Sequence, residues 1–82
     1  MKTVFVRLNG SLAEALGTSR LTVQLPEPAT LADLIANLSK RHPSTVELLS
    51  RAVPVSGGKH LGATFVLPAD QEVALLMPIA GG

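Results

Sequence analysis

The alternation of apolar and polar residues near the start of the chain predicts two β-strands. Val4, Val6 and Leu8 occupy every second position, which is the period of a strand that buries one face. The same alternation recurs over residues 21–25. Both segments therefore predict strands with one side turned toward a core.

The segment between these two strands, residues 11–17, carries two leucines at helical spacing. Alanine and glutamate fill much of it, and such residues are depleted in strands. We expect a single helical turn within a loop here. The alternative is a tight hairpin at Asn9 and Gly10, because Asn followed by Gly is a strong hairpin signal.

The clearest helix in the sequence begins after Thr30. Thr30 can cap the helix, and Asp33 stands at the third position of a capping box. A basic last turn and then Pro43 mark the end of the helix. A second, shorter helix is expected to start at residue 44, with Glu47 completing its capping box. One apolar stripe runs along the first helix and consists of Leu31, Leu34, Ile35 and Leu38.

The second half of the chain predicts two further strands and the turns between them. Residues 52–55 form a short strand, and Pro54 places it at a sheet edge or near the start of the strand. Residues 56–59 are a hairpin turn, since glycine tolerates the positive φ that such turns require. Residues 64–67 fit either a strand or an apolar turn. Residues 72–77 form the last strand.

This order of elements predicts an α+β fold of the β-grasp, or ubiquitin-like, type. One amphipathic helix can cover one face of a mixed sheet, and it gives a crossover long enough for parallel strands. The first and last strands are then parallel in the middle of the sheet. We expect a β-grasp domain over residues 1–78 and a flexible tail with two glycines over residues 79–82.

Composition excludes several classes of function. The formal net charge is only +1 and no basic run is present, so no nucleic-acid partner is expected. No apolar run approaches the roughly 18 residues of a membrane span, and no signal peptide is evident, so we expect a cytoplasmic protein with no membrane partner. Cysteine is absent. Of the residues, 46% are hydrophobic and 16% are charged, which makes a partner surface plausible.

No conventional active site can be assembled from the sequence. His42 and His60 are the only histidines, and neither has a second ligand at metal-binding spacing. The carboxylates are scattered and mostly explained by helix starts and turns. We therefore expect no bound cofactor, no metal and no catalytic residue of the ordinary kind.

The strongest functional signal is the end of the sequence. Gly81 and Gly82 follow Pro78 closely, after the last strand. Residues without a Cβ atom can thread a narrow channel and adopt any backbone conformation there. The carboxylate of Gly82 is therefore well suited to enter the active site of another enzyme.

With these motifs in place, the chain resembles the MoaD/ThiS family of ubiquitin-like sulfur carriers. It is most similar to the MoaD branch, the small subunit of molybdopterin synthase. The resemblance is carried by residues 78–82, by the turn and strand start at 70–73, and by the loop at 13–17. Met77 departs from the pattern, because these carriers often have the first proline of a pair there.

The resemblance implies that Gly82 is adenylated and then converted to a thiocarboxylate, which donates sulfur to the pterin precursor in molybdenum cofactor biosynthesis. The implied partners are a MoaE-like large subunit, a MoeB-like adenylating enzyme that consumes ATP, and a sulfurtransferase donor. Three other interpretations stay open: a sulfur carrier for thiazole, cysteine or tRNA thiolation, a protein modifier conjugated to lysines, and a plain interaction module.

The last strand is apolar at both parities, which suggests a partner surface beside the tail. A sheet covered by a helix on one side should carry polar residues on its open face, and Phe5 breaks that rule. A loop or the short helix could instead cover this face. The residues expected to contact a partner are Phe5, Leu75, Met77, Pro78, Ile79, Ala80 and Gly81.

Overall fold

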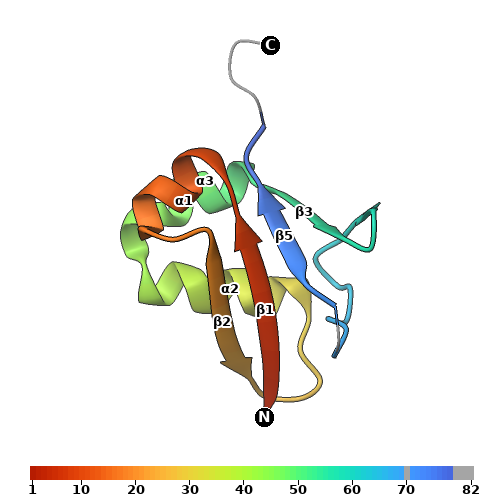
Figure 1. Cartoon of the computed structure of the whole chain (residues 1–82). Coiled ribbons are helices and arrows are strands. Elements are labelled where there is room, and N and C mark those ends of the chain that lie inside the picture. Colours follow the sequence, from red (N-terminus) through yellow and green to blue (C-terminus); the bar gives the residue numbers. More distant parts are fainter. Residues whose placement is uncertain (70, 79–82) are drawn as a thin grey trace.

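The computed structural model of the chain describes residues 1–69 and 71–78. Within this part, five strands form one sheet in the order β2-β1-β5-β3-β4, with helices packed on it (Figure 1). The elements are β1 (Lys2–Leu8), α1 (Gly10–Leu16), β2 (Arg20–Leu25), α2 (Leu31–Arg41), a 3-10 turn (Pro43–Thr45), α3 (Val46–Arg51), β3 (Val53–Ser56), β4 (Lys59–His60) and β5 (Val73–Leu76).

The first and last strands lie side by side in the sheet, as predicted. β1 is parallel to β5, with Val6 opposite Val73 and Leu8 opposite Leu75. On its other side β1 pairs antiparallel with β2, and β5 pairs antiparallel with β3. This mixed sheet with a crossover helix is the β-grasp fold, which confirms the predicted fold class.

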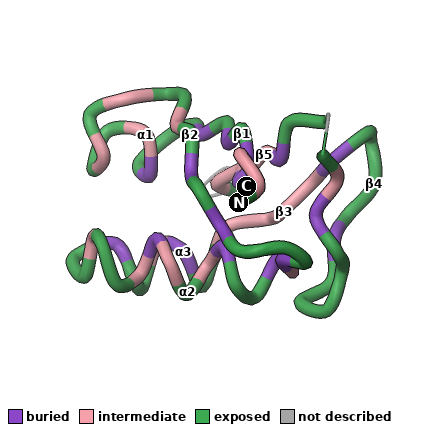
Figure 2. The backbone as a smooth tube through the Cα atoms, turned by 90° about the horizontal axis from the view of Figure 1, so that it is seen from below, coloured by how far each residue is buried: buried purple, intermediate pink, exposed green. Residues whose placement is uncertain are grey.

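The hydrophobic core lies between the sheet and the helices. Figure 2 shows α2 and α3 in one layer and the strands in another, with buried residues on the sides that face each other. Alternate residues of each strand supply the sheet side of the core, as the two-residue period requires. The fully buried strand and helix residues with the largest side chains are Leu12, Leu34, Leu38, Leu75, Val4, Val6, Val23 and Val73.

Helix α2 begins as the sequence predicted. The side-chain oxygen of Thr30 accepts a hydrogen bond from the Asp33 backbone N–H at 3.3 Å, and the Asp33 carboxylate accepts one from the Thr30 N–H at 2.8 Å. This is a complete capping box. The expected apolar stripe is the buried face of the helix, with Ile35 only partly buried at its margin.

The prediction for the segment after β1 was too short. Residues Gly10–Leu16 form a helix of two turns, and neither a single turn in a loop nor a hairpin at Asn9 is present. The helix is fixed by Leu12, which is fully buried, and it ends at Gly17 in the left-handed region with φ +72°. Tertiary burial thus extends a segment whose local signals were weak.

The second predicted capping box is wrong. The chain first forms the 3-10 turn Pro43–Thr45, and α3 then starts at Val46 with no side-chain cap. The Glu47 carboxylate instead forms an ion pair with Arg51 one turn later, at 2.8 Å. The Thr45 hydroxyl donates to the His42 carbonyl and so ties this turn to the end of α2.

The remaining strands agree with expectation in part: β3 lies one residue later than predicted, and Lys59–His60 form a further strand, β4, where the sequence predicted none. Pro54 is the second residue of β3, near its start, and its carbonyl accepts a hydrogen bond from Leu61 N–H beyond the end of β4. Gly57 and Gly58 form the β3–β4 turn with φ of +58° and +78°. Of residues 64–67, Thr64 belongs to a turn and Val66 forms an isolated antiparallel bridge with Thr30, so the segment is not a strand of the sheet.

The predicted tail, residues 79–82, lies outside the described residues, as does Asp70. β5 is two residues shorter than expected, one at each end. None of the helices within residues 1–69 and 71–78 is long and apolar enough to cross a membrane.

Candidate functional site

The strand that leads to the tail is held on both sides in the middle of the sheet. β5 lies between β1 and β3, and its residues pair with Leu8 on one side and with Val53 on the other. Val73 and Leu75 are completely buried. Because both ladders fix the strand, the chain reaches residue 77 in a defined direction (Figure 1).

Leu75 belongs to the core and does not contribute its side chain to a surface. Its exposed fraction is 0%, whereas its neighbours Ala74 and Leu76 are only partly buried. This corrects the expectation that Leu75 contacts a partner. The parity of the last strand was ambiguous in the sequence because both of its faces are apolar, and the structure assigns Leu76 to the open face.

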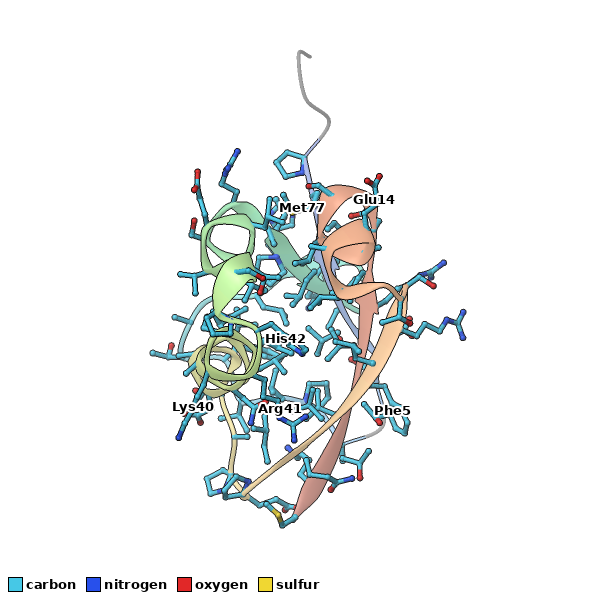
Figure 3. The ribbon with its side chains drawn as sticks, turned by 90° about the vertical axis from the view of Figure 1, so that its left-hand side faces the viewer. Phe5, Glu14, Lys40, Arg41, His42 and Met77 are labelled. Atoms are coloured by element: carbon cyan, nitrogen blue, oxygen red, sulfur yellow. The ribbon has the colours of Figure 1, made fainter. Side chains whose placement is uncertain are left out.

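Met77 packs at the junction of β5 and α1. Its side chain is partly buried against the hydrophobic core, and Figure 3 shows it next to α1. Its backbone N–H donates a hydrogen bond to Oδ1 of Asn9 at 2.6 Å. A Cβ atom added to Gly10 would lie 3.3 Å from the Met77 Cβ, which is a tight contact. Met77 is thus fixed by main-chain and side-chain contacts.

Pro78 follows as an exposed residue, and it is the last one that the structure describes. The expected contact residues Ile79, Ala80 and Gly81, and the expected reactive residue Gly82, lie outside the described residues. The predicted site residues that the structure does place therefore divide into one core residue, Leu75, one anchored residue, Met77, and two exposed residues, Phe5 and Pro78.

The open face of the sheet carries apolar side chains in two groups. Phe5 is 48% exposed and points away from the helices (Figure 3). A second group, the outer apolar group, consists of the partly buried residues Val53, Val55, Ala74 and Leu76 on β3 and β5. The register places these four side by side, since Ala74 pairs with Val55 and Leu76 pairs with Val53.

An ion pair separates Phe5 from the outer apolar group. The Arg7 guanidinium lies 4.0 Å from the Glu72 carboxylate, and both side chains are more than one-third exposed. Arg7 is directly opposite Ala74 in the register. The open face is therefore an apolar surface divided by one pair of opposite charges. The alternative, that the short helix covers this face, is wrong, because α3 lies on the opposite side (Figure 2).

The titratable residues give no sign of a conventional active site in the part of the chain that the structure describes. Residues 1–69 and 71–78 contain no group of three His, Cys, Asp or Glu side chains that could hold a metal ion. What the described residues do provide is a rigid exit for the last residues of the chain and an apolar face beside it.

Comparison with known protein families shows to which family the chain belongs. A sequence model of the ThiS family matches residues 6–82, which is nearly the whole chain and includes both terminal glycines. The chain belongs to the ThiS family. A comparison with curated protein sequences gave no significant match.

Several solved structures share the fold of this ThiS-family chain at low sequence identity. SAMP1 from Haloferax volcanii is 23% identical, with a TM-score of 0.84 over 98% of this chain and 99% of that one. A putative molybdopterin converting factor, subunit 1, from Pyrococcus furiosus is 21% identical, with a TM-score of 0.84 over 96% and 100%.

A third similar structure is a complex of two proteins. It contains subunits 1 and 2 of the molybdopterin-converting factor from Helicobacter pylori, and the match has 20% identity and a TM-score of 0.69 over 98% and 99% of the two chains. These three similarities support the β-grasp fold of the ThiS-family chain. A relative of the same fold is therefore known with a second subunit.

Sequence reasoning missed Asn9 and Gly10 as parts of this site. The two residues were considered only as a hairpin turn. Their contacts with Met77 join positions that are 68 and 67 residues apart, and no local pattern indicates such a contact. The only available signal was the expected parallel pairing of the first and last strands, which brings residue 9 near residue 77.

Proposed function

We propose that this ThiS-family chain is a sulfur carrier whose Gly82 carboxylate is converted to a thiocarboxylate, and that it acts as the small subunit of a molybdopterin synthase. The observation that carries the proposal is the family match through Gly81 and Gly82, directly beyond a strand held in the middle of the sheet. No residue of the described domain is needed for the chemistry itself.

The chemistry requires activation by a partner. A carboxylate resists nucleophiles because it is anionic and its leaving group is poor. An adenylating enzyme would join the Gly82 carboxylate to the α-phosphate of ATP and release pyrophosphate, so that AMP becomes the leaving group. The persulfide of a sulfurtransferase then attacks the acyl-adenylate and displaces AMP, and a thiol reduces the resulting acyl disulfide, which leaves the thiocarboxylate on Gly82. ATP is thus a substrate of the partner, and the carrier itself is proposed to bind no cofactor.

The contribution of this chain is to present the carboxylate. Four residues follow Pro78 and can span at most about 14 Å when fully extended. A partner must therefore bring its active site close to the end of β5. Glycine at the last two positions leaves the backbone free of Cβ atoms, which permits entry into a narrow channel.

The open face of the sheet is the proposed docking surface. Phe5 and Leu76 expose apolar area on the face opposite the helices, and exposed apolar area on a small domain often marks an interface. Met77, Pro78, Ile79, Ala80 and Gly81 would extend the contact toward the active site of the partner. A MoeB-like adenylating enzyme and a MoaE-like large subunit are the proposed partners, and the two-subunit complex from H. pylori supports the second.

A second candidate function is protein modification, in which Gly82 is joined to a lysine of another protein. The similarity to SAMP1, one of the small archaeal modifier proteins, is the observation that favours this second candidate. Both functions begin with adenylation of the same carboxylate. They differ in the nucleophile that follows, which is sulfur in one case and an amine in the other.

Loading of Gly82 can be tested by mass spectrometry. The chain is incubated with its cognate adenylating enzyme, ATP and a sulfur donor, and we expect one oxygen of the C-terminal carboxylate to be replaced by sulfur. Deletion of Gly82 should abolish the change, because the new C-terminal carboxylate would lie one residue short of the nucleotide site of the adenylating enzyme. Gly82→Ala keeps the length and adds only a Cβ atom, so it tests the need for glycine separately from the need for length, and we expect it to be loaded more slowly than the wild-type chain.

Two further measurements separate the candidates. The thiocarboxylated chain is mixed with the large subunit and a pterin precursor, and the chain adenylated without a sulfur donor is mixed with a protein mixture rich in lysine. Transfer of sulfur to the pterin supports the leading proposal, and formation of isopeptide-linked species supports the second. Loading of the chain without Gly82 at the wild-type rate would contradict both.

A further inference from the structure

The side chain of Asn9 makes an unexpected hydrogen bond. Asn9 is the N-cap residue of α1, a position at which an asparagine oxygen usually accepts a bond from the first turn of its own helix. No such bond is formed. Its Oδ1 atom accepts instead from the Met77 N–H, 68 residues away, at 2.6 Å.

This hydrogen bond continues the central ladder past the end of β1. Leu8 is the last residue of β1 to pair with β5, because the chain then turns into α1. The backbone carbonyl of Asn9 accepts a hydrogen bond from the Ala13 N–H within α1, and the side chain of Asn9 supplies the acceptor for the Met77 N–H. Gly10 lets the start of α1 lie close to Met77, because a Cβ atom added to Gly10 would lie only 3.3 Å from the Met77 Cβ. The φ of Gly10 is +56°, a backbone conformation that favours glycine.

We propose that Asn9 is a positioning residue for the tail: by binding the Met77 N–H, it fixes the point and direction at which residues 78–82 leave the fold. This inference rests on the proposed function, because it concerns the delivery of Gly82 to a partner. It also depends on a particular feature of this chain. A proline at position 77 would have no N–H, so the bond requires a residue other than proline there, as Met77 is.

The expected size of the effect follows from conformational entropy. When Met77 is fixed, the segment that must be ordered in the active site of the partner begins at Pro78. When Met77 is free, about one more residue must be ordered, and fixing the backbone of one residue lowers an equilibrium constant roughly 5- to 30-fold. We therefore expect kcat/KM for the loading of Gly82 to fall about tenfold in Asn9→Ala.

The test compares three variants with the wild-type chain in the adenylation reaction. Asn9→Ala removes the acceptor, Met77→Pro removes the donor together with the packed Met77 side chain, and Asn9→Asp retains an acceptor. We expect Asn9→Ala to lose kcat/KM, Met77→Pro to lose at least as much, and Asn9→Asp to keep most of the wild-type value. Asn37→Ala is the matched control, because it removes the same amide group from α2 and should leave the rate unchanged.

Two readouts separate positioning from a general loss of structure. Amide hydrogen exchange should accelerate at Met77 in Asn9→Ala while the core strand amides stay protected. The Kd of the adenylating enzyme for chains that lack residues 78–82 should be the same with and without Asn9→Ala, because the open face is unchanged and no tail has to be ordered. A variant that unfolds is identified by circular dichroism, and the donor-side variant Met77→Pro then carries the test.

The outcomes distinguish this inference from the proposed function. If wild-type chain is not loaded at all, the proposed function fails. If the wild-type chain is loaded, and folded Asn9→Ala and Met77→Pro are loaded as fast as the wild-type chain, the proposed function stands and the positioning role of Asn9 is wrong. Failure of Asn9→Asp to recover the rate would also overturn it.

Discussion

The two faces of the central strands show how differently neighbouring residues are used. On β1, Val6 is 1% exposed and belongs to the core, while Phe5 beside it is 48% exposed. On β5, Leu75 is fully buried and Leu76 is partly exposed. All four side chains are apolar. The hydrophobic effect alone therefore does not account for the open face, whose apolar residues stabilise the isolated fold much less than those of the inner face.

This difference suggests that the two faces of the sheet have different roles. Residues that face the helices determine whether the domain folds, and residues on the open face are available for a partner. The last strand belongs to both, because its inner side chains hold it in the core and its end leads to Pro78. A perturbation of one face should leave the other function intact, and this separation can be tested.

The largest expected effect comes from Leu75→Ala on the inner face. Truncation of a fully buried leucine removes its contacts and leaves a cavity, so the free energy of unfolding should fall by about 2–5 kcal/mol. Leu76→Ala, on the adjacent residue, is the matched control. It should lower the free energy of unfolding by less than about 1.5 kcal/mol. Urea denaturation followed by circular dichroism measures both. Equal losses would mean that the two faces do not differ as described.

The fold could be predicted from the sequence wherever the signals are local. The α2 helix carries its own cap, stripe and stop, and the structure confirms each of them. The α1 helix was predicted too short because its stability depends on burial of Leu12 in a core built by distant elements. The cap at Glu47 failed because the 3-10 turn Pro43–Thr45 moves the start of α3 to Val46, so that Glu47 is the second helical residue and not the third, which a capping box requires.

The candidate site was only partly predictable for a similar reason. The two glycines are visible in the sequence, and Phe5 stands out as an apolar residue at a position expected to be polar. Which face of the last strand is buried could not be decided, because its residues are apolar at both parities. The bond between Asn9 and Met77 depends on the parallel register of two strands from opposite ends of the chain.

An intermediate effect is expected from Phe5→Glu on the open face. Because Phe5 is about half exposed, the domain should stay folded, but a charge replaces apolar area at the proposed interface. We expect the Kd for the adenylating enzyme or the large subunit to rise at least about tenfold, as for an interface residue of moderate importance. Titration calorimetry measures the affinity, and thermal melting followed by circular dichroism checks the fold.

The matched control for this variant is Ala36→Glu. Ala36 is exposed on α2, on the other side of the sheet from the open face, and the substitution introduces the same single negative charge. It should leave the affinity nearly unchanged. Unfolding of Phe5→Glu would place Phe5 among the residues that hold the fold together, and unchanged affinity in a folded variant would locate the interface elsewhere.

The smallest effect is expected at the ion pair that divides the open face. The Arg7 guanidinium and the Glu72 carboxylate are 4.0 Å apart, and their side chains are 58% and 38% exposed. Solvent screens such pairs, and exposed pairs typically contribute between zero and about 1 kcal/mol. A double-mutant cycle with Arg7→Gln and Glu72→Gln should therefore give a coupling energy below about 0.5 kcal/mol. High salt should reduce it further. A coupling above about 1 kcal/mol that persists in high salt would mean that this pair stabilises the fold, and the open face would then share the structural role of the inner face.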